Sequence, residues 1–438
     1  MRLRFSPLCM QRDISHTRSP EYIEKCQLLS DNHFTRKRKM PVDKLLLSVV
    51  CRKGRTLAIE LREFAMAAET ERITKAGYLK QRKKLNPEAL RDLNTSHVKN
   101  TYEGAPIKDI GGYLLLAADG SKVAVPTTSE SLERFGSVGS PTAATAGISG
   151  LYDVLNSIII SCSVERGNHN EMEAAYKQLR DAPEAIGDRK TIITLDRGYP
   201  SLPYFNKMLK EDQKFVVRLS RADYPREQDT MTTDDENVEV KITSQRMLKH
   251  IGKPYEQELR DAGSIMMRFV KIRLEGGEME CLATNLAPSE FSTEEICRIY
   301  GFRWGIETVF GMLKNNLELG NFTGTKPLLI EQDIHACVYL CNVAMDMAIQ
   351  GQMDLEESGK NAGRKHKMAV NKSYAIGIIK DSLLKALLEP NADKQEMLFF
   401  MMVEEIRSVV EPVRPGRQYE RKNNNKNAKH SNTHKRSY

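Results

Sequence analysis

Three acidic residues, Asp119, Asp196 and Glu307, stand where carboxylates could act together on one substrate. Asp119 and Asp196 each follow a short apolar run, at 114–118 and 191–195, and each is followed by a glycine within two residues. Such runs predict buried strands, and ligands of open α/β sheets bind beyond the carboxyl ends of the strands. We therefore expect the two carboxylates to meet at one sheet edge, although either aspartate alone could begin an ordinary turn.

A predicted long helix supplies the third acid. Residues 292–295, Ser-Thr-Glu-Glu, have the pattern of a helix N-terminal cap. Along this helix Tyr300, Arg303, Glu307 and Lys314 follow one another at intervals of 3, 4 and 7 residues, which confines them to an arc of about 60°. A salt-bridge ladder would explain Arg303 and Glu307, but it explains the tyrosine and the lysine less well. We call these four residues the stripe, and their pattern favours a functional face of the helix. An apolar stripe next to it is expected to pack on the sheet.

These residue types suit phosphoryl transfer on DNA. Three carboxylates can hold two Mg²⁺ ions about 3.5 to 4 Å apart, one activating the attacking oxygen and the other stabilising the leaving oxygen. The arginine, lysine and tyrosine of the stripe can bind the phosphates that position the scissile bond. Such a reaction needs no covalent nucleophile and no nucleotide cofactor.

The helix signature resembles that of a known family, the DDE transposases of insertion sequences. Tyr300-x2-Arg303-x3-Glu307-x6-Lys314 matches completely the signature for which one group of this family, the insertion-sequence-four type, is named. Asp119 in Ala-Asp-Gly-Ser and Asp196 in Asp-Arg-Gly-Tyr look like the other two acids of the family. The resemblance covers roughly residues 30 to 345.

The resemblance implies a fold and a reaction. The fold would be α/β, with an RNase H-like core and a β-rich insertion. The reaction would be hydrolysis at the transposon end, followed by attack of the freed 3′-hydroxyl on target DNA, a cut-and-paste transposition. Its metal would be Mg²⁺, as two ions, with Mn²⁺ as a possible substitute, and its partners transposon-end DNA and target DNA, with a homodimer in the DNA complex. The residues expected to contact DNA are Tyr300, Arg303, Lys314 and Arg197.

Changes of pattern along the chain predict its organisation. We expect a helical N-terminal DNA-binding region at 1–105, of which 1–32 follows no clear pattern; the first part of the core at 106–220; the β-rich insertion at 221–280; the second part of the core, with the catalytic helix, at 281–345; a helical C-terminal region at 346–413; and a disordered basic tail at 414–438.

Composition excludes several protein classes. The chain of 438 residues is 40% hydrophobic and 28% charged, with a formal net charge of +8 that is concentrated at its two ends. No apolar run is long enough to cross a membrane, so we expect a cytoplasmic, nucleoid-associated protein. The eight cysteines lack the spacing of a zinc site or a disulfide framework, and Cys337 and Cys341 fit a packed core better than a ligand pair. Basic ends favour contact with a polyanion.

Two rival functions stay open at this point. Another nuclease built on an RNase H-like core would share the three carboxylates, but the full helix stripe argues against it. A repurposed or inactive transposase that only binds DNA would share the basic ends. The single tryptophan, Trp304, lies in the signature helix, whereas some relatives stack a displaced base on a tryptophan of the insertion. A hairpin step is therefore left undetermined.

Overall fold

The fold centres on one large mixed sheet, which the computed structural model describes together with its helices for residues 5–28, 33–34, 39–273, 279–359 and 365–413. The eight strands lie in the order β3-β2-β1-β4-β5-β8-β7-β6. Their bounds are β1 Leu114–Ala124, β2 Thr145–Asp153, β3 Ile158–Arg166, β4 Thr191–Leu195, β5 Lys214–Leu219, β6 Asp235–Lys241, β7 Ser264–Arg273 and β8 Met279–Thr284. The class is therefore mixed α/β, with a mixed sheet and many helices.

Only the middle of the sheet is parallel. β1 pairs in parallel with β4, and β4 with β5, whereas every other neighbouring pair is antiparallel. The pairing of β1 with β4 ends at Ala117 and Thr194. The predicted strand at 114–118 was expected to stop before Asp119, and this expectation is wrong: β1 continues to Ala124, because its second half pairs with β2.

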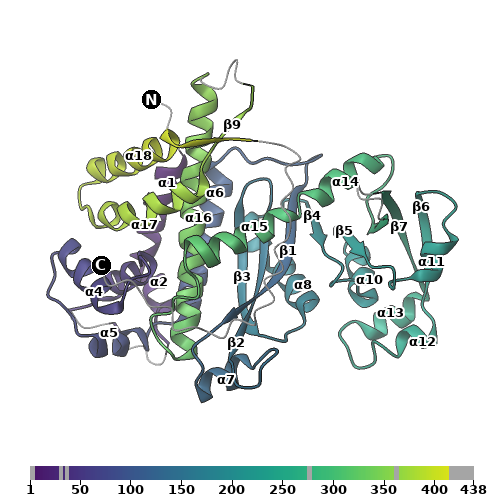
Figure 1. The fold of residues 1–438 in the computed structure, drawn as a ribbon, viewed down its shortest axis with the longest axis horizontal. Coiled ribbons are helices and arrows are strands. Elements are labelled where there is room, and N and C mark those ends of the chain that lie inside the picture. The colour runs from purple at the N-terminus through teal and green to yellow at the C-terminus, as the bar shows by residue number, and fades with distance from the viewer. Residues whose placement is uncertain (1–4, 29–32, 35–38, 274–278, 360–364, 414–438) are drawn as a thin grey trace.

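Helices cover both faces of the sheet (Figure 1). Those that precede or interrupt the strands are α1 Phe5–Thr17, α2 Pro20–Lys25, α3 Val42–Val50, α4 Leu57–Ala67, α5 Lys75–Arg82, α6 Pro87–Gly104, α7 Ser129–Phe135, α8 Glu171–Asp181, α9 Pro183–Ile186, α10 Leu202–Lys210, α11 Pro225–Thr230, α12 Ser244–Met247 and α13 Glu256–Ala262. After the last sheet strand come α14 Thr293–Gly301, α15 Trp304–Gly311, the π-helical turn η1 Met312–Asn316, α16 Pro327–Glu357, α17 Lys372–Leu388 and α18 Ala392–Ser408. A separate pair of short strands, β9 Met368–Val370 and β10 Val410–Pro412, links the last helices.

Alternation along β1 divides the core. Leu116 and Ala118 pack with the cluster that contains α8 and α10, whereas Leu115 and Ala117 face the clusters formed with α14, α15 and α16. Because successive strand residues point to opposite faces, Asp119 has the parity of Ala117 and belongs to the face of α14 and α15. The next residue, Gly120, belongs to the face of α8.

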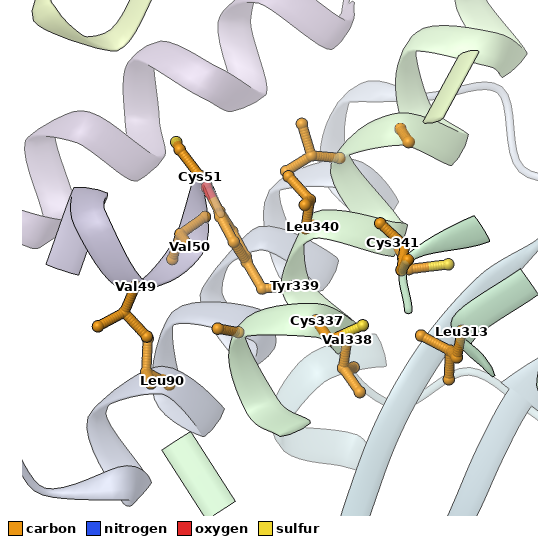
Figure 2. Close-up of a cluster of buried hydrophobic side chains, with 14 of the residues drawn as sticks. Val49, Val50, Cys51, Leu90, Leu313, Cys337, Val338, Tyr339, Leu340 and Cys341 are labelled. Carbon is orange, nitrogen blue, oxygen red and sulfur yellow. The ribbon is translucent and has the colours of Figure 1, made fainter. Parts of the chain in front are cut away.

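Helix α16, which has 31 residues, lies in the centre of the hydrophobic cluster that Ala117 faces. Figure 2 shows its residues 337–341 between Val49 and Leu90 on one side and Leu313 on the other. Cys337 and Cys341 are both buried in this cluster. All eight cysteines are free thiols, and the two that share a helical face pack as small apolar side chains, as the sequence predicted.

The segment 1–32, for which the sequence showed no clear pattern, forms two helices where it is described. α1 packs against α6 and α16, and its backbone at Phe5 donates to the side chain of Gln350. Its Asp13 is buried and accepts a hydrogen bond from Tyr339. These partners lie more than 300 residues away, so the helix depends on tertiary contacts that no local periodicity reveals. The tail at 414–438, predicted to be disordered, and part of the basic run at 36–39 lie outside the described residues.

The segment 221–280 contributes strands as well as helices. Its β6 and β7 extend the central sheet beyond β8, and the short helices α11, α12 and α13 surround them at the far end of the molecule (Figure 1). The same segment therefore continues the central sheet. In the region 346–413, helices dominate, but the strands β9 and β10 interrupt the helical pattern.

Candidate active site

The two aspartates lie at the same edge of the parallel part of the sheet. Asp119 comes two residues after the last β1 residue that pairs with β4, and Asp196 directly follows the end of β4. Because β1 and β4 run in parallel and in register, both positions point away from the paired region in the same direction. The carboxylates predicted to share a sheet edge therefore do so, with Asp119 inside a longer strand.

The predicted single helix that carries the third acid is interrupted. The segment turns at residues 302–303 between α14 and α15, where the amides of Arg303, Gly305 and Ile306 each donate to the third preceding residue instead of the fourth. A second irregularity follows at η1, where the amide of Leu317 donates to Met312. Such tightened and widened turns are often found where helices carry functional side chains. The expectation of one regular helix is thus wrong in detail.

All four residues of the stripe nevertheless lie near the sheet edge. The Tyr300 hydroxyl donates to Oδ1 of Asp196 at 3.3 Å. Arg303 Nη2 donates to Oε1 of Glu307 at 2.8 Å. Lys314 Nζ donates to the Ser121 hydroxyl at 2.6 Å, two residues after Asp119. The helix segment is therefore bonded to both strands that carry the aspartates.

Burial and neighbouring charges set the electrostatics of Asp119. Burial is the main cause that raises the pKa of its carboxyl to about 6, and the carboxylates of Glu307 and Glu171 raise it further. The backbone amide of Gly120 and the guanidinium of Arg303 act in the opposite direction. The usual pKa of this carboxyl is 3.8. A cation bound beside Asp119 would stabilise the ionised carboxylate and lower its raised pKa.

The two cations of the stripe respond to the same surroundings. Burial lowers the pKa of Lys314, and Asp119 opposes that effect. For Arg303 burial also acts downward, but Tyr300, Glu307 and Asp196 outweigh it and raise the pKa of the guanidinium. The charges of both side chains therefore interact with those of the acids.

Two side chains at this edge were not predicted as site residues. Glu171, the first residue of α8, lies against Gly120: a Cβ atom at position 120 would stand 2.7 Å from its Oε1. Tyr199 is 2% exposed, and its hydroxyl has no hydrogen-bond partner among the described residues. Burial raises the pKa of Tyr199, and Asp119, Glu171 and Asp196 raise it further. The only signals in the sequence were the Asp-Arg-Gly-Tyr motif and the start of a helix at 171.

The remaining predicted residue and the aromatic neighbours are exposed. Arg197 follows Asp196 in an exposed turn. Phe302 and Trp304, on either side of Arg303, are 40% and 50% exposed, and the guanidinium of Arg303 stands over the Trp304 ring at 5.6 Å. The site thus opens to solvent on the side of the helix interruption.

The donor set fits hard divalent cations by chemistry. Asp119, Asp196, Glu307 and Glu171 offer oxygen ligands, which Mg²⁺ and Mn²⁺ prefer. Within the described ranges, however, no three histidine, cysteine or acidic side chains converge as a ready metal cluster. Arg303 stands among the acids instead and is bonded to Glu307. Asp196 and Glu307 act on Arg303, and Asp119 acts on Lys314, so both cations lie in the field of the acids.

Comparisons with known proteins show the family of this chain. The chain is 22% identical over 345 residues to the transposase InsG for insertion sequence element IS4 from Escherichia coli strain K12, with 74% of this chain and 73% of that protein covered. A solved structure, the piggyBac transposase synaptic complex with hairpin DNA, aligns with 92% of this chain and 86% of that one, at 10% identity and a TM-score of 0.48. Among the described residues no helix is long and apolar enough to span a membrane. A family model of the transposase DDE domain matches residues 110–343, more than half of the chain, and the protein therefore belongs to the DDE transposases of insertion sequences, a family of DNA transposases.

Proposed function

We propose that this transposase cuts DNA at the ends of its element and joins the freed 3′-hydroxyl groups to target DNA, with Asp119, Asp196 and Glu307 as its catalytic carboxylates. The observation that carries the proposal is the meeting of two strands and one helix: Asp119 and Asp196 at one sheet edge, with the Tyr300 hydroxyl on Asp196 and the field of Glu307 on Asp119. A core with the strand order 3-2-1-4-5 and β2 antiparallel to its neighbours supports an RNase H-like assignment of β1 to β5.

The three carboxylates are the proposed ligands of two Mg²⁺ ions, for which Mn²⁺ could substitute. When bound, such ions would activate the attacking oxygen and stabilise the leaving oxygen of an in-line displacement. The residues of the chain then act around that centre. Tyr300 orients Asp196 through its hydroxyl, and Arg303 holds Glu307.

Four side chains are proposed to grip DNA phosphates near the cleaved end. Arg303 and Lys314 are bonded to Glu307 and Ser121 in the DNA-free chain, and each can exchange that bond for a phosphate oxygen when DNA enters. Tyr300 borders the same edge, and Arg197 stands exposed next to Asp196. Contacts of this kind fix the register of the DNA without reading its sequence.

The N-terminal helical region is proposed to hold the element's end. A pocket between the start of α3 and helix α5 is lined by Lys39, Lys44 and Lys80, beside Gln81. Glu71 also lines this pocket and pairs with Lys39, whereas Lys44 and Lys80 can bind phosphates. A homodimer on the paired ends is the proposed assembly, because the two ends of an element must be cut and joined together.

Strand cleavage of a labelled duplex that carries the element's own end tests the proposal. We expect the wild type to cut at the element boundary with Mg²⁺, and Asp196→Asn and Glu307→Gln to cut at least ~10³-fold more slowly, since a lost metal ligand removes several kcal/mol of transition-state stabilisation. Both variants should still shift the duplex in a binding gel. Glu294→Gln, an exposed acid on α14, is the matched control and should cut like the wild type.

Either of two results would overturn this assignment. If the wild type binds the duplex but cuts it with neither Mg²⁺ nor Mn²⁺, the DNA-binding alternative replaces the enzyme. If the wild type cuts and Asp196→Asn cuts equally well, the enzyme stands but its carboxylates have been assigned wrongly.

A further inference from the structure

Glu171 reaches the candidate site from the face of the sheet opposite to Glu307. Helix α8 begins at Glu171, and the side chain extends over Gly120, the residue after Asp119. A Cβ at position 120 would lie 2.7 Å from Oε1, 2.9 Å from Cδ and 3.2 Å from Cγ of Glu171. Only a residue without a side chain leaves this approach open, since real Cβ contacts are longer. The missing side chain at 120 therefore admits the carboxylate to the sheet edge.

A structural role does not account for this carboxylate. An acid in the first turn of a helix is favoured by the helix dipole, but the exposed Glu173 serves that role equally well. The cap of α8 is made by Asn170, whose side chain accepts from the amide of Glu173. Within the described part of the chain, the Glu171 carboxylate takes part in no hydrogen bond and no ion pair. It is an uncommitted acceptor beside Asp119.

A second, independent feature points into the same space. Tyr199 is 2% exposed, and its buried hydroxyl has no hydrogen-bond partner among the described residues. A buried hydroxyl without a partner is destabilising, so its position calls for a ligand or a bound water. The charges that act on it most are those of Asp119, Glu171 and Asp196. The orphaned hydroxyl thus lies within the electrostatic field of all three carboxylates.

From this geometry we infer that Glu171 is a fourth carboxylate of the metal site, which shares a divalent cation with Asp119 and completes the coordination from the α8 face. The inference rests on the proposed function, because it takes Asp119 and Asp196 as metal ligands. Glu307 approaches from the α15 face and Glu171 from the other, so the two acids would serve different cations at the two sides of Asp119.

Binding of Mn²⁺ itself provides the test, with DNA cleavage not needed as a readout. Mn²⁺ is titrated into the full chain, free and with a duplex of the element's end, and the bound fraction is read from the electron paramagnetic resonance of the free ion and from the rise in melting temperature. We expect Glu171→Gln to weaken Mn²⁺ binding about 10-fold or more. Glu173→Gln, in the same helical turn, should bind like the wild type.

Gly120→Ala provides a second variant that keeps the acid. The added methyl group would displace the flexible end of Glu171 rather than any backbone atom, so Mn²⁺ binding should weaken without loss of the carboxylate. In the double variant Gly120→Ala/Glu171→Gln, the alanine should have little further effect. If the two losses are instead independent and additive, the alanine acts through the strand and not through Glu171.

The outcomes separate this inference from the proposed function. If Asp196→Asn weakens Mn²⁺ binding and Glu171→Gln does not, Glu171 is no ligand and only the inference fails. If neither variant changes Mn²⁺ binding, or the wild type binds none with or without DNA, the carboxylate assignment of the proposed function fails as well. Loss in Glu171→Gln, with Glu173→Gln unchanged and both folded by circular dichroism, supports the fourth ligand.

Discussion

Two buried arginines of this transposase, Arg82 and Arg303, have opposite surroundings. Arg82, at the end of α5, is 0% exposed and donates to Gln332, Asp333, the Leu329 carbonyl oxygen and Thr323. Asp333 is 0% exposed as well and also accepts from the amide of Thr323. Burial would raise the pKa of Asp333, but the cations Arg52 and Arg82 outweigh it and lower the pKa. Each nitrogen of the Arg82 side chain thus has a hydrogen-bond partner, and Asp333 has two arginines as counter-ions.

Arg303 is 3% exposed and lacks such a complete set of partners in the described part of the chain. It donates to Glu307, while its buried Nε has no partner among the described residues. Around it lie more carboxylates than cations, and the pKa of Asp119 is raised. The contrast indicates that a fully bonded arginine with a paired carboxylate holds α5 on α16, whereas an excess of acids with orphaned polar atoms fits the proposed binding of a cation and a phosphate. The four predictions below test it through the free energy of unfolding.

The largest effect should come from unbalancing the Arg82 cluster. Arg82→Met removes the nearer of the two cations of Asp333 and leaves Arg52 at 3.5 Å, and breaking a buried pair costs up to about 3 to 5 kcal/mol. Urea unfolding measures the loss. The double variant Arg82→Met/Asp333→Leu removes both charges and should recover a large part of it. A loss below ~1 kcal/mol in the single variant would mean that this cluster is not a structural one.

A third buried cluster sharpens the contrast through pH. His97 Nδ1 lies 2.6 Å from Oδ2 of Asp13, and its Nε2 lies 3.4 Å from Oδ2 of Asp346. Burial lowers the pKa of His97, but the two carboxylates outweigh it and raise the pKa from 6.5 to about 9. The proton therefore stabilises the fold fully below pH 6.5, and this contribution is lost as the pH rises through 9, by roughly 3 kcal/mol.

The measurement compares unfolding free energies of the wild type and His97→Asn between pH 6 and 10. Their difference should shrink as the pH rises. His335 gives the matched control, because burial and Arg91 lower its pKa to about 4. The stability difference for His335→Asn should therefore be constant above about pH 7.5, and below it should change only because the unfolded histidine takes up a proton. If the stability difference for His97→Asn does not change with pH, His97 is not charged in the folded protein.

At the candidate active site, removing the titrating group is expected to have the opposite effect on stability. Because the pKa of Asp119 is raised from 3.8 to about 6, the folded chain binds a proton more tightly than the unfolded chain, and the metal-free fold loses stability as the pH rises from about 4 to 6. At pH 7 Asp119→Asn should therefore raise the free energy of unfolding, by roughly 2 to 3 kcal/mol, while cleavage is lost.

A higher unfolding free energy of Asp119→Asn would mean that the wild type loses stability because it keeps unpaired acids together for function. It should diminish when Mn²⁺ is present, since the cation stabilises only the wild type. If Asp119→Asn instead destabilises the metal-free chain as Arg82→Met does, the two clusters are alike and the contrast between them fails.

The smallest effect concerns the helix that leads into the site. Ser292 and Glu295 form a capping box at the start of α14, with the Glu295 amide donating to the Ser292 hydroxyl at 3.3 Å and the Ser292 amide to Oε2 of Glu295 at 2.9 Å. Ser292→Ala should cost about 1 kcal/mol in unfolding free energy. Ser292→Thr should restore it. Cleavage should change little, because the cap stabilises the helix and Tyr300 acts at its other end; a large loss of cleavage would show that the cap also positions the site.

Local patterns predicted those parts of the site that depend on a single element. An apolar run before an acid predicted that Asp119 and Asp196 follow buried strand segments, because a buried strand is encoded within a few residues. The spacing of Tyr300, Arg303, Glu307 and Lys314 predicted a shared face, and all four side chains lie near the sheet edge although the helix is interrupted. The interruption at 302–303 was missed because short-range periodicity tolerates a tightened turn.

The sequence by itself predicted which residues supply the acids, the strands that lead into two of them and the family to which the chain is similar. Only the tertiary structure decided that β1 runs on past Asp119, that α1 packs against partners more than 300 residues away, and that Glu171 stands over Gly120 beside the unpartnered Tyr199 hydroxyl. The physical reason is that periodicity reports which face of one element is buried. The match or excess of charge in a cluster is set by segments that meet only when the chain is folded.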